Sequence, residues 1–356
     1  ARHDPVYEDV ATKFFEHFAY IASALDDMAL WDDAESFFYD RLVAPDGTQT
    51  VMKVRSIGGL VPLVASAVFD PRHVRRAAGF SKRAEWFVER RQGGHDWLGT
   101  LTGGPGERGI LAVLSPERLA RVLAFVFDPE RFLSPHGIRS LSRWHLDHPF
   151  TLELDGATAT IAYEPAESRA AIYGGNSNWR GPVWFPLNVL VLESLLRYRV
   201  ALGDALRIGS LSDGSRTDAP ASDSAATDAA QAEPSGSDAA LAGSTPSSAP
   251  SADHALADLR ERLISLFLRG PDGRRPADGE VERYRSDPEW RDQVTFYEYF
   301  DGDTGRGLGA SHQTGWTGLV AHLILERPVP TGAKPAHGEA AESSGAGAGP
   351  PIRPAG

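Results

Sequence analysis

The chain has 356 residues and a net charge of −12, and its basic residues form no cluster, which argues against nucleic acid or an anionic membrane surface as a partner. Hydrophobic residues make up 42% and charged residues 24%, which are ordinary values for a globular protein. The absence of cysteine excludes disulfides and thiolate metal sites. With no apolar run of 18 residues and no signal peptide, the sequence predicts a cytoplasmic protein without a membrane partner.

Helical periodicity dominates the first part of the chain. Asp4 and Pro5 can start a first helix, in which apolar residues recur on one face. A second helix is predicted from the cap-then-proline pair Ser115-Pro116 to Val126. The residues expected on the apolar face of the first helix are Ala11, Phe14, Phe15, Phe18, Ile21, Ala22 and Leu25.

A β-hairpin is predicted at residues 150–162, after the second helix. Apolar residues alternate with polar ones on either side of Asp155-Gly156. The Asp-Gly pair is typical of a two-residue type I′ turn.

Three more helices follow, at 183–195, 256–267 and 315–325, where apolar residues recur at helical spacing. Long connections rich in aromatic, amide and acidic residues lie between the helices, and connections of this length are usually functional. This pattern is typical of a helical barrel with a site at one rim, although a helical binding scaffold would show it too. The long connections cover 30–40, 173–185 and 296–313.

Two segments have a composition that cannot form a packed core. Residues 208–254 consist almost entirely of Ser, Ala, Asp, Gly, Thr and Pro, and residues 328–356 of Gly, Ala, Pro and Ser with scattered Glu. Neither can bury enough apolar surface to offset the entropy of ordering, so we expect both to be disordered. The folded portions are then 1–207 and 255–327.

The segment 173–188 has a composition suited to sugar binding. It holds two tryptophans, an arginine and three amides within sixteen residues. Aromatic rings stack on the apolar faces of sugars, while amides and guanidinium groups bond to hydroxyls. The alternative is that Trp179 and Trp184 are core residues and that Arg180 pairs with a carboxylate, and composition alone does not decide.

A second segment, 296–317, places Glu298 among aromatic residues, ahead of a glycine-rich turn. An inverting glycosidase needs a carboxylate to deprotonate water, and Glu298 is a candidate for that base. The aspartates of the turn suggest a calcium loop, but the spacing does not fit because no Glu stands at the twelfth position. The residue types alone favour a simpler alternative, in which Asp301 and Asp303 form a turn and Glu298 is a paired surface acid.

The sequences Gly-Gly-Asn-Ser-Asn-Trp-Arg-Gly-Pro-Val-Trp (174–184) and Glu-Tyr-Phe-Asp-Gly-Asp-Thr-Gly-Arg-Gly (298–307) resemble glycoside hydrolase family 63. The similarity is to its bacterial glucosidase-like branch, related to mannosyl-oligosaccharide glucosidase and mannosylglycerate hydrolase. Segments 30–40, 53–56 and 312–316 resemble the same branch.

The resemblance implies an inverting α-glycosidase acting on a carbohydrate substrate without a cofactor. It implies an all-α fold, a partial (α/α)6 toroid made of 1–207 and 255–327, with the hairpin as an insertion. Glu298 would be the general base, and no ligands for a metal ion are assigned. The residues that the resemblance places in the sugar site are Asn176, Asn178, Trp179, Arg180, Trp184, His312, Gln313 and Trp316.

In that family the general acid is an aspartate in a Gly-Leu-Asp-Asn-like segment, upstream of the part that this chain resembles. No such segment is present, and Asp32 and Asp33 are the nearest acids, in a different sequence context. We therefore expect little hydrolysis by the chain alone, with Asp32, Asp33 and Asp40 the first acids to mutate if hydrolysis occurs. The alternative is a carbohydrate-binding or inactive remnant. Another (α/α)6 enzyme, such as a trehalase-like or glucoamylase-like one, fits the motifs less well.

Overall fold

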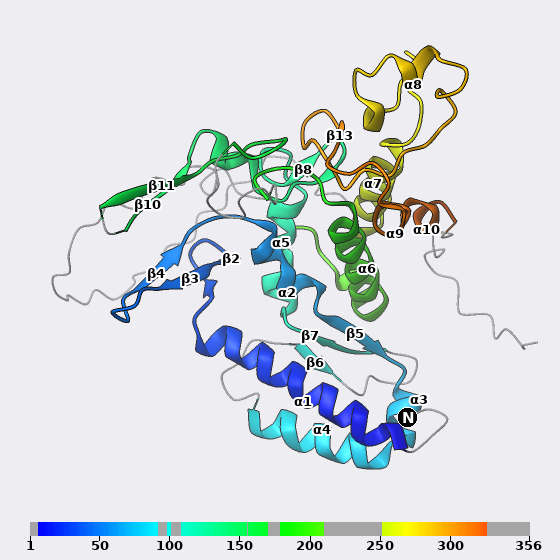
Figure 1. The fold of residues 1–356 in the computed structure, drawn as a ribbon. Helices are drawn as coiled ribbons and strands as arrows, with labels where there is room; N and C mark the ends of the chain where they lie inside the picture. Colours follow the sequence, from blue (N-terminus) through cyan, green and yellow to red (C-terminus); the bar gives the residue numbers. More distant parts are fainter. Residues whose placement is uncertain are drawn as a thin grey trace, which may run out of the picture.

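The computed structural model describes residues 6–91, 98–100, 108–154, 156–169, 179–209 and 251–325. Its helices are α1 (Val6–Asp27), α2 (Val61–Val64), α3 (Pro71–Arg76), α4 (Ala78–Arg91), α5 (Pro116–Val126), α6 (Phe185–Leu202), α7 (Ala252–Ser265), α8 (Arg283–Ser286), α9 (Thr314–Thr317) and α10 (Val320–Leu325) (Figure 1). Its strands are β1 (Trp31–Asp32), β2 (Phe37–Phe38), β3 (Asp40–Val43), β4 (Gln49–Met52), β5 (Ser66–Phe69), β6 (Leu98–Thr100), β7 (Gly109–Ala112), β8 (Leu133–Ser134), β9 (Gly137–Ile138), β10 (Phe150–Leu154), β11 (Ala157–Ile161), β12 (Tyr299–Phe300) and β13 (Gly307–Leu308).

The prediction of an all-α partial toroid is wrong, because the described residues form a mixed α/β structure. The strands make small antiparallel sheets, one of three strands in the order β5–β7–β6 and the others of two. Most of these strands lie in the connections between helices, and several are only two residues long. A strand of two residues is too short to show the alternation of apolar and polar residues that predicts strands, so only the helices were predicted in these regions.

Helix α5 begins where the sequence predicts, whereas α7 begins four residues before its predicted start at Leu256. The Ser115 hydroxyl accepts a hydrogen bond from the backbone N–H of Arg118 at 3.3 Å, and Pro116 opens α5. Ser251 caps α7 in the same way, so this helix includes the last three residues of the segment 208–254. Ile208, at the other end of that segment, is buried. Residues 210–250 and 328–356, where disorder is predicted, lie outside the described residues.

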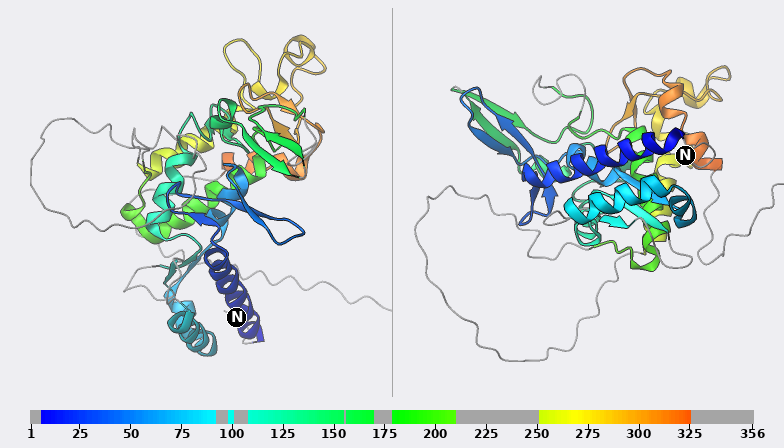
Figure 2. Two further views of the ribbon diagram at one scale, coloured as in Figure 1. Left: turned by 90° about the vertical axis from the view of Figure 1, so that its left-hand side faces the viewer. Right: turned by 90° about the horizontal axis from the view of Figure 1, so that it is seen from below.

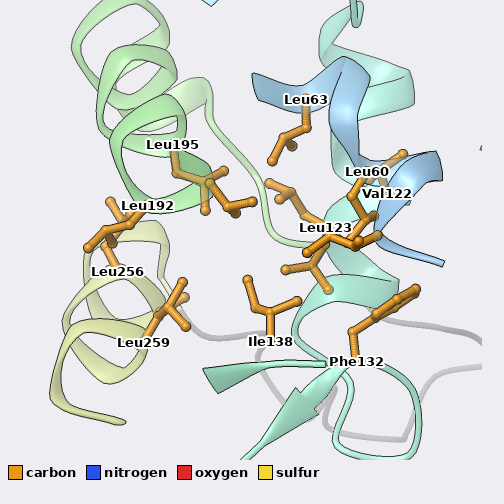
Figure 3. Close-up of a cluster of buried hydrophobic side chains, with 14 of the residues drawn as sticks. Leu60, Leu63, Val122, Leu123, Phe132, Ile138, Leu192, Leu195, Leu256 and Leu259 are labelled. Carbon is orange, nitrogen blue, oxygen red and sulfur yellow. The ribbon is translucent and has the colours of Figure 1, made fainter. Parts of the chain in front are cut away.

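The main core lies between α5, α6 and α7 (Figure 3). Leucines from α6 and α7 face side chains of α2, α5 and the loop strands. The buried side chains labelled there are Leu60, Leu63, Val122, Leu123, Phe132, Ile138, Leu192, Leu195, Leu256 and Leu259. None of the described helices has the length and the apolar character that crossing a bilayer requires.

A second, smaller core lies between α1 and α4, which extend side by side away from the rest of the fold (Figure 2). Phe15 contacts Phe80 and Phe87 edge-on, at ring-centroid distances of 5.9 Å. The face that α1 buries is narrower than the sequence predicts, because Phe14 and Ile21 are 72% and 62% exposed.

The hairpin predicted at 150–162 is present as β10 and β11. Leu154 pairs with Ala157, which leaves two residues for the turn, and Gly156 has a φ of +76°, a conformation that glycine adopts without strain. Ile161, at its base, packs with Val54 and Leu141. The hairpin is therefore held at one end only and projects from the body of the protein (Figure 1).

The end of α6 is fastened to the start of α7. The guanidinium of Arg199 donates two hydrogen bonds to the carboxylate of Asp253, at 2.9 and 3.0 Å. Further along, Gly209 lies so close to the carbonyl of Ala120 on α5 that a Cβ there would be 2.5 Å from it. Both ends of the connection 210–250 are thus fixed to the helical core.

His145 is buried and neutral, and this predicts a loss of stability in mild acid. Its Nε2 accepts from the backbone N–H of Arg55 at 2.9 Å, so Nδ1 carries the proton and donates to the carbonyl of His148. Burial lowers the pKa of His145 to about 4. As the pH falls below the usual histidine pKa of about 6.5, this histidine is protonated in the unfolded chain but stays neutral in the folded chain, which favours unfolding.

We expect this residue to lower the free energy of unfolding by about 2 kcal/mol between pH 8 and pH 5. Urea titrations at both pH values measure the change. The control is His145→Gln, which keeps hydrogen-bonding groups but does not titrate, and which should remove that share of the pH dependence. An unchanged pH dependence in the variant would assign the acid sensitivity to other groups.

Candidate functional site

The two segments that the sequence singles out are joined through their backbones. Val183 and Phe300 exchange two hydrogen bonds, with N···O distances of 2.7 and 2.9 Å. Val183 also bridges to Arg139, near β9. The start of α6 and the strand β12 are therefore neighbours in space, although more than 100 positions separate them in the sequence.

Four aromatic side chains meet at this junction. The rings of Trp179 and Trp184 stack in parallel, with centroids 4.6 Å apart, and Trp184 stacks on Tyr299 at 4.9 Å. Trp316 meets Trp184 edge-on at 6.4 Å. We call these four residues the aromatic stack. Trp184 and Tyr299 are buried within it, whereas Trp316 is 40% exposed and Trp179 partly exposed, so these two outer rings remain accessible.

Glu298 lies beside the aromatic stack and is partly exposed. Its carbonyl accepts a hydrogen bond from the indole N–H of Trp316 at 3.0 Å, and its carboxylate accepts one from the backbone N–H of Ala310 at 3.4 Å. At Gly309, where φ is +68°, a Cβ would come within 3 Å of both the Glu298 carboxylate and the Tyr299 ring. The carboxylate is thus adjacent to the ring that stacks on Trp184.

The glycine-rich turn after Glu298 is built by its aspartates. Asp301 is buried, and its carboxylate accepts hydrogen bonds from the backbone N–H groups of Asp303 and Thr304, both at 2.9 Å. Asp303 in turn accepts from the Tyr163 hydroxyl at 2.8 Å and pairs with Arg139 at 3.2 Å. Asp301 therefore acts as a turn former, as in the simpler of the two alternatives, while the Asp303 carboxylate attaches the turn to Tyr163 and Arg139.

Burial holds the pKa of the Tyr163 phenol well above its usual range, so that this hydroxyl remains a donor to Asp303. Within the part of the chain that the structure describes, no group of three or more His, Cys, Asp or Glu side chains could hold a metal ion. The hydrogen bonds of Asp301 and Asp303 hold the turn between β12 and β13, and this fixes the backbone next to Glu298.

Arg180 contacts the hairpin β10–β11. It is 2% exposed, and its guanidinium donates to the carbonyl of Thr160 on β11 at 3.2 Å. Its own carbonyl accepts from the backbone N–H of Glu164 at 2.7 Å. The partner seen here is a backbone carbonyl, whereas the alternative considered for Arg180 was a pair with a carboxylate; this contact does not place Arg180 on a sugar.

The remaining predicted site residues are less closely placed. His312 is exposed and its backbone bridges to Phe296, while Gln313 directly precedes α9. Asn176 and Asn178 lie outside the described residues.

A surface hollow lies elsewhere, between the end of α6 and the start of α7, and is lined by Arg199, Gly203, Asp204, Leu206, Arg207, Ile208, Ser251, Ala252 and Asp253.

The acids considered as replacements for a missing general acid have other roles. Asp32 accepts from the backbone N–H of Glu35 at 3.0 Å, and Asp33 accepts from the indole N–H of Trp31 at 2.7 Å with its side chain 82% exposed. Asp40 is exposed at the start of β3.

Sequence reasoning missed a charged cluster around Glu35, in the turn between β1 and β2. Its carboxylate accepts hydrogen bonds from Tyr39 and Lys53, both at 2.5 Å, and pairs with Arg55 at 3.1 Å. Burial and the bond to Glu35 raise the pKa of Tyr39. In the sequence, Glu35 and Tyr39 stand four positions apart, which could have indicated their contact. Lys53 and Arg55 lie in a separate segment, so nothing in the sequence indicated that they join the cluster.

No known protein family matches the chain. The chain is 37% identical over 346 residues, which is 92% of its own length, to the uncharacterized protein YMR196W of Saccharomyces cerevisiae. It spans 29% of that protein. The chain is thus similar to one part of a much longer polypeptide, and the similarity assigns it no activity.

Proposed function

We propose that the chain contributes the sugar-binding surface and the general base of an inverting α-glycosidase, and that the general acid lies outside it. The observation that supports this is the position of Glu298 beside the aromatic stack, which segments far apart in the sequence assemble. Tryptophan faces bind the apolar side of a sugar ring, and a carboxylate next to them is suited to deprotonate an attacking water. Carbohydrate is the proposed partner, and a cytoplasmic location remains a prediction.

A second candidate is a carbohydrate-binding module without catalysis. The roles of Asp32, Asp33 and Asp40 favour it, since each of these acids is exposed or caps a turn. Both candidates predict that sugar binds at the aromatic stack. They differ only in whether Glu298 acts on the bound sugar.

Removing an accessible ring of the stack should weaken sugar binding. We expect Trp316→Ala to reduce the affinity for methyl α-D-glucopyranoside or methyl α-D-mannopyranoside by about fivefold, as a lost stacking contact is worth about 1 kcal/mol. Titration followed by NMR chemical shifts measures this. Trp290→Ala is the matched control, because Trp290 is equally exposed at 40% but lies near Tyr284. Equal affinities in the two variants would contradict binding at the stack.

A further inference from the structure

Four backbone segments form one hydrogen-bonded ladder that ends beside the aromatic stack. Ser142 donates its backbone N–H to the carbonyl of Arg55, at an N···O distance of 2.9 Å. Ser140 donates in the same way to the carbonyl of Pro182, again at 2.9 Å. Together with the two bonds between Val183 and β12, these contacts make the ladder continuous. Its segments, in order, are 55–57, 139–142, 182–183 and 299–300.

One face of this ladder belongs to the main core and the other to the aromatic stack. Residues paired across a ladder point to the same face, and their neighbours in the sequence point to the opposite one. Val183 is paired with Phe300, and both are buried in the main core. Their neighbours Trp184 and Tyr299 lie on the opposite face, where their rings stack on each other.

The same alternation places Arg55 on the face of the aromatic stack. Arg139 is paired with Val183, so it shares the face of Val183, and so does Leu141 two residues further on. Ser56 is paired with Leu141, which puts its neighbour Arg55 on the opposite face. The aromatic stack and Arg55 therefore lie on one face of the ladder, toward its two edges.

Arg55 fixes the carboxylate of Glu35 at its edge of the ladder. It is buried, with its guanidinium over the rings of Phe125 and Trp144, 5.2 and 4.9 Å from their centroids. From there it pairs with Glu35, whose carboxylate also accepts from the buried phenol of Tyr39. This buried half of the charged cluster holds Glu35 in one position, as a pre-organised binding group requires.

The other half of the cluster is open to solvent. The side chain of Lys53 is 44% exposed, and those of Glu35 and Asp32 are 24% and 26% exposed. The Lys53 ammonium pairs with both carboxylates, at 2.5 Å from Glu35 and 3.6 Å from Asp32. Neighbouring hydroxyls of a sugar can donate to carboxylate oxygens and accept from an ammonium N–H. We call Asp32, Glu35 and Lys53 the outer group, and its chemistry suits a pair of sugar hydroxyls.

We propose that the outer group is a second contact point for the carbohydrate that binds at the aromatic stack, so that the site takes an oligosaccharide rather than a single sugar. This inference rests on the proposed function, because it assigns the far end of the same substrate. The two edges of the ladder are three strand spacings, or about 14 Å, apart. One sugar ring is shorter than that, so only a chain of several sugars reaches from Trp316 to Lys53.

The dependence of affinity on sugar chain length tests this inference. The probes are methyl α-D-glucopyranoside, maltose, maltotriose and maltotetraose, titrated by NMR chemical shifts. We expect maltotetraose to bind about tenfold more tightly than the methyl glucoside, the gain that a charge-assisted hydrogen bond provides. Lys53→Ala should abolish this difference, and Asp32→Asn, which keeps an oxygen for the Glu35 N–H, should reduce it. Lys82→Ala, at an exposed lysine of α4, is the matched control and should keep the full difference.

The outcomes separate this inference from the proposed function. No gain with chain length, or a gain that survives in both Lys53→Ala and Asp32→Asn, would overturn the inference and leave sugar binding at the stack standing. Failure of all the probes to bind would contradict the proposed function itself. Because partly exposed ion pairs add little to stability, both variants should keep the thermal midpoint of the unsubstituted chain. A lowered midpoint together with lost affinity for the methyl glucoside would identify the outer group as structural and overturn the inference.

Discussion

Glu298→Gln is expected to abolish the turnover of α-glucosyl fluoride by this chain. Fluoride leaves with little acid assistance, so the substrate bypasses the missing general acid and depends on the base alone. Loss of a general base lowers a rate by about 10²- to 10⁴-fold. Glutamine keeps the size of the side chain and can still accept the hydrogen bond from the Ala310 N–H, so the fold should be preserved.

The release of fluoride ion, followed with an ion-selective electrode, measures this prediction. Glu289→Gln is a matched control, since Glu289 is an exposed acid of the same region and should not affect the rate. Unactivated α-glucosides should not be cleaved by either protein. Turnover that survives in Glu298→Gln would contradict the assignment of the base and direct attention to Asp32 and Glu35.

Trp184→Ala is expected to cost about 3–5 kcal/mol of unfolding free energy, the range for removing a buried tryptophan. Trp184 is 6% exposed and contacts Trp179, Tyr299 and Trp316, so its loss leaves a cavity between the two segments. Urea unfolding followed by circular dichroism gives the value. Trp184→Phe should lose less, because it keeps an aromatic ring in contact with Tyr299. A cost below 1 kcal/mol for the alanine variant would show that the junction contributes little to stability.

The elements that the sequence predicted correctly share strong local signals. The hairpin β10–β11 has an alternating pattern and an Asp-Gly turn, and α5 has a serine cap and a proline before an apolar period. Each signal arises within about ten residues, where local sterics and capping decide the conformation.

The strands missed by the sequence depend on partners far along the chain. Ile110-Leu111-Ala112 reads as a short apolar run that fits either a helix or a strand. It becomes a strand because Ala67 and Gly99 pair with its central residue Leu111 from both sides. Such a choice is made by tertiary contacts, which no local pattern reveals.

Of the candidate site, the sequence found the residues but not their orientation. Trp179, Trp184, Trp316 and Glu298 were chosen for their residue types, and they lie together in the structure. Arg180 has equally suitable chemistry but is directed toward Thr160. Its direction depends on where the hairpin packs, and that packing is not encoded in the segment 173–188 itself.

The ion pair between Arg199 and Asp253 has a consequence for how this protein can vary. Helices α6 and α7 pack on each other in the main core, and this ion pair adds a direct contact between the end of one and the start of the other. The entropy of closing a flexible loop grows only with the logarithm of its length, by about 0.6 kcal/mol for each doubling. Homologous chains can therefore gain or lose tens of residues at this point while the helical core stays intact, which makes the junction a tolerant place for evolutionary insertion.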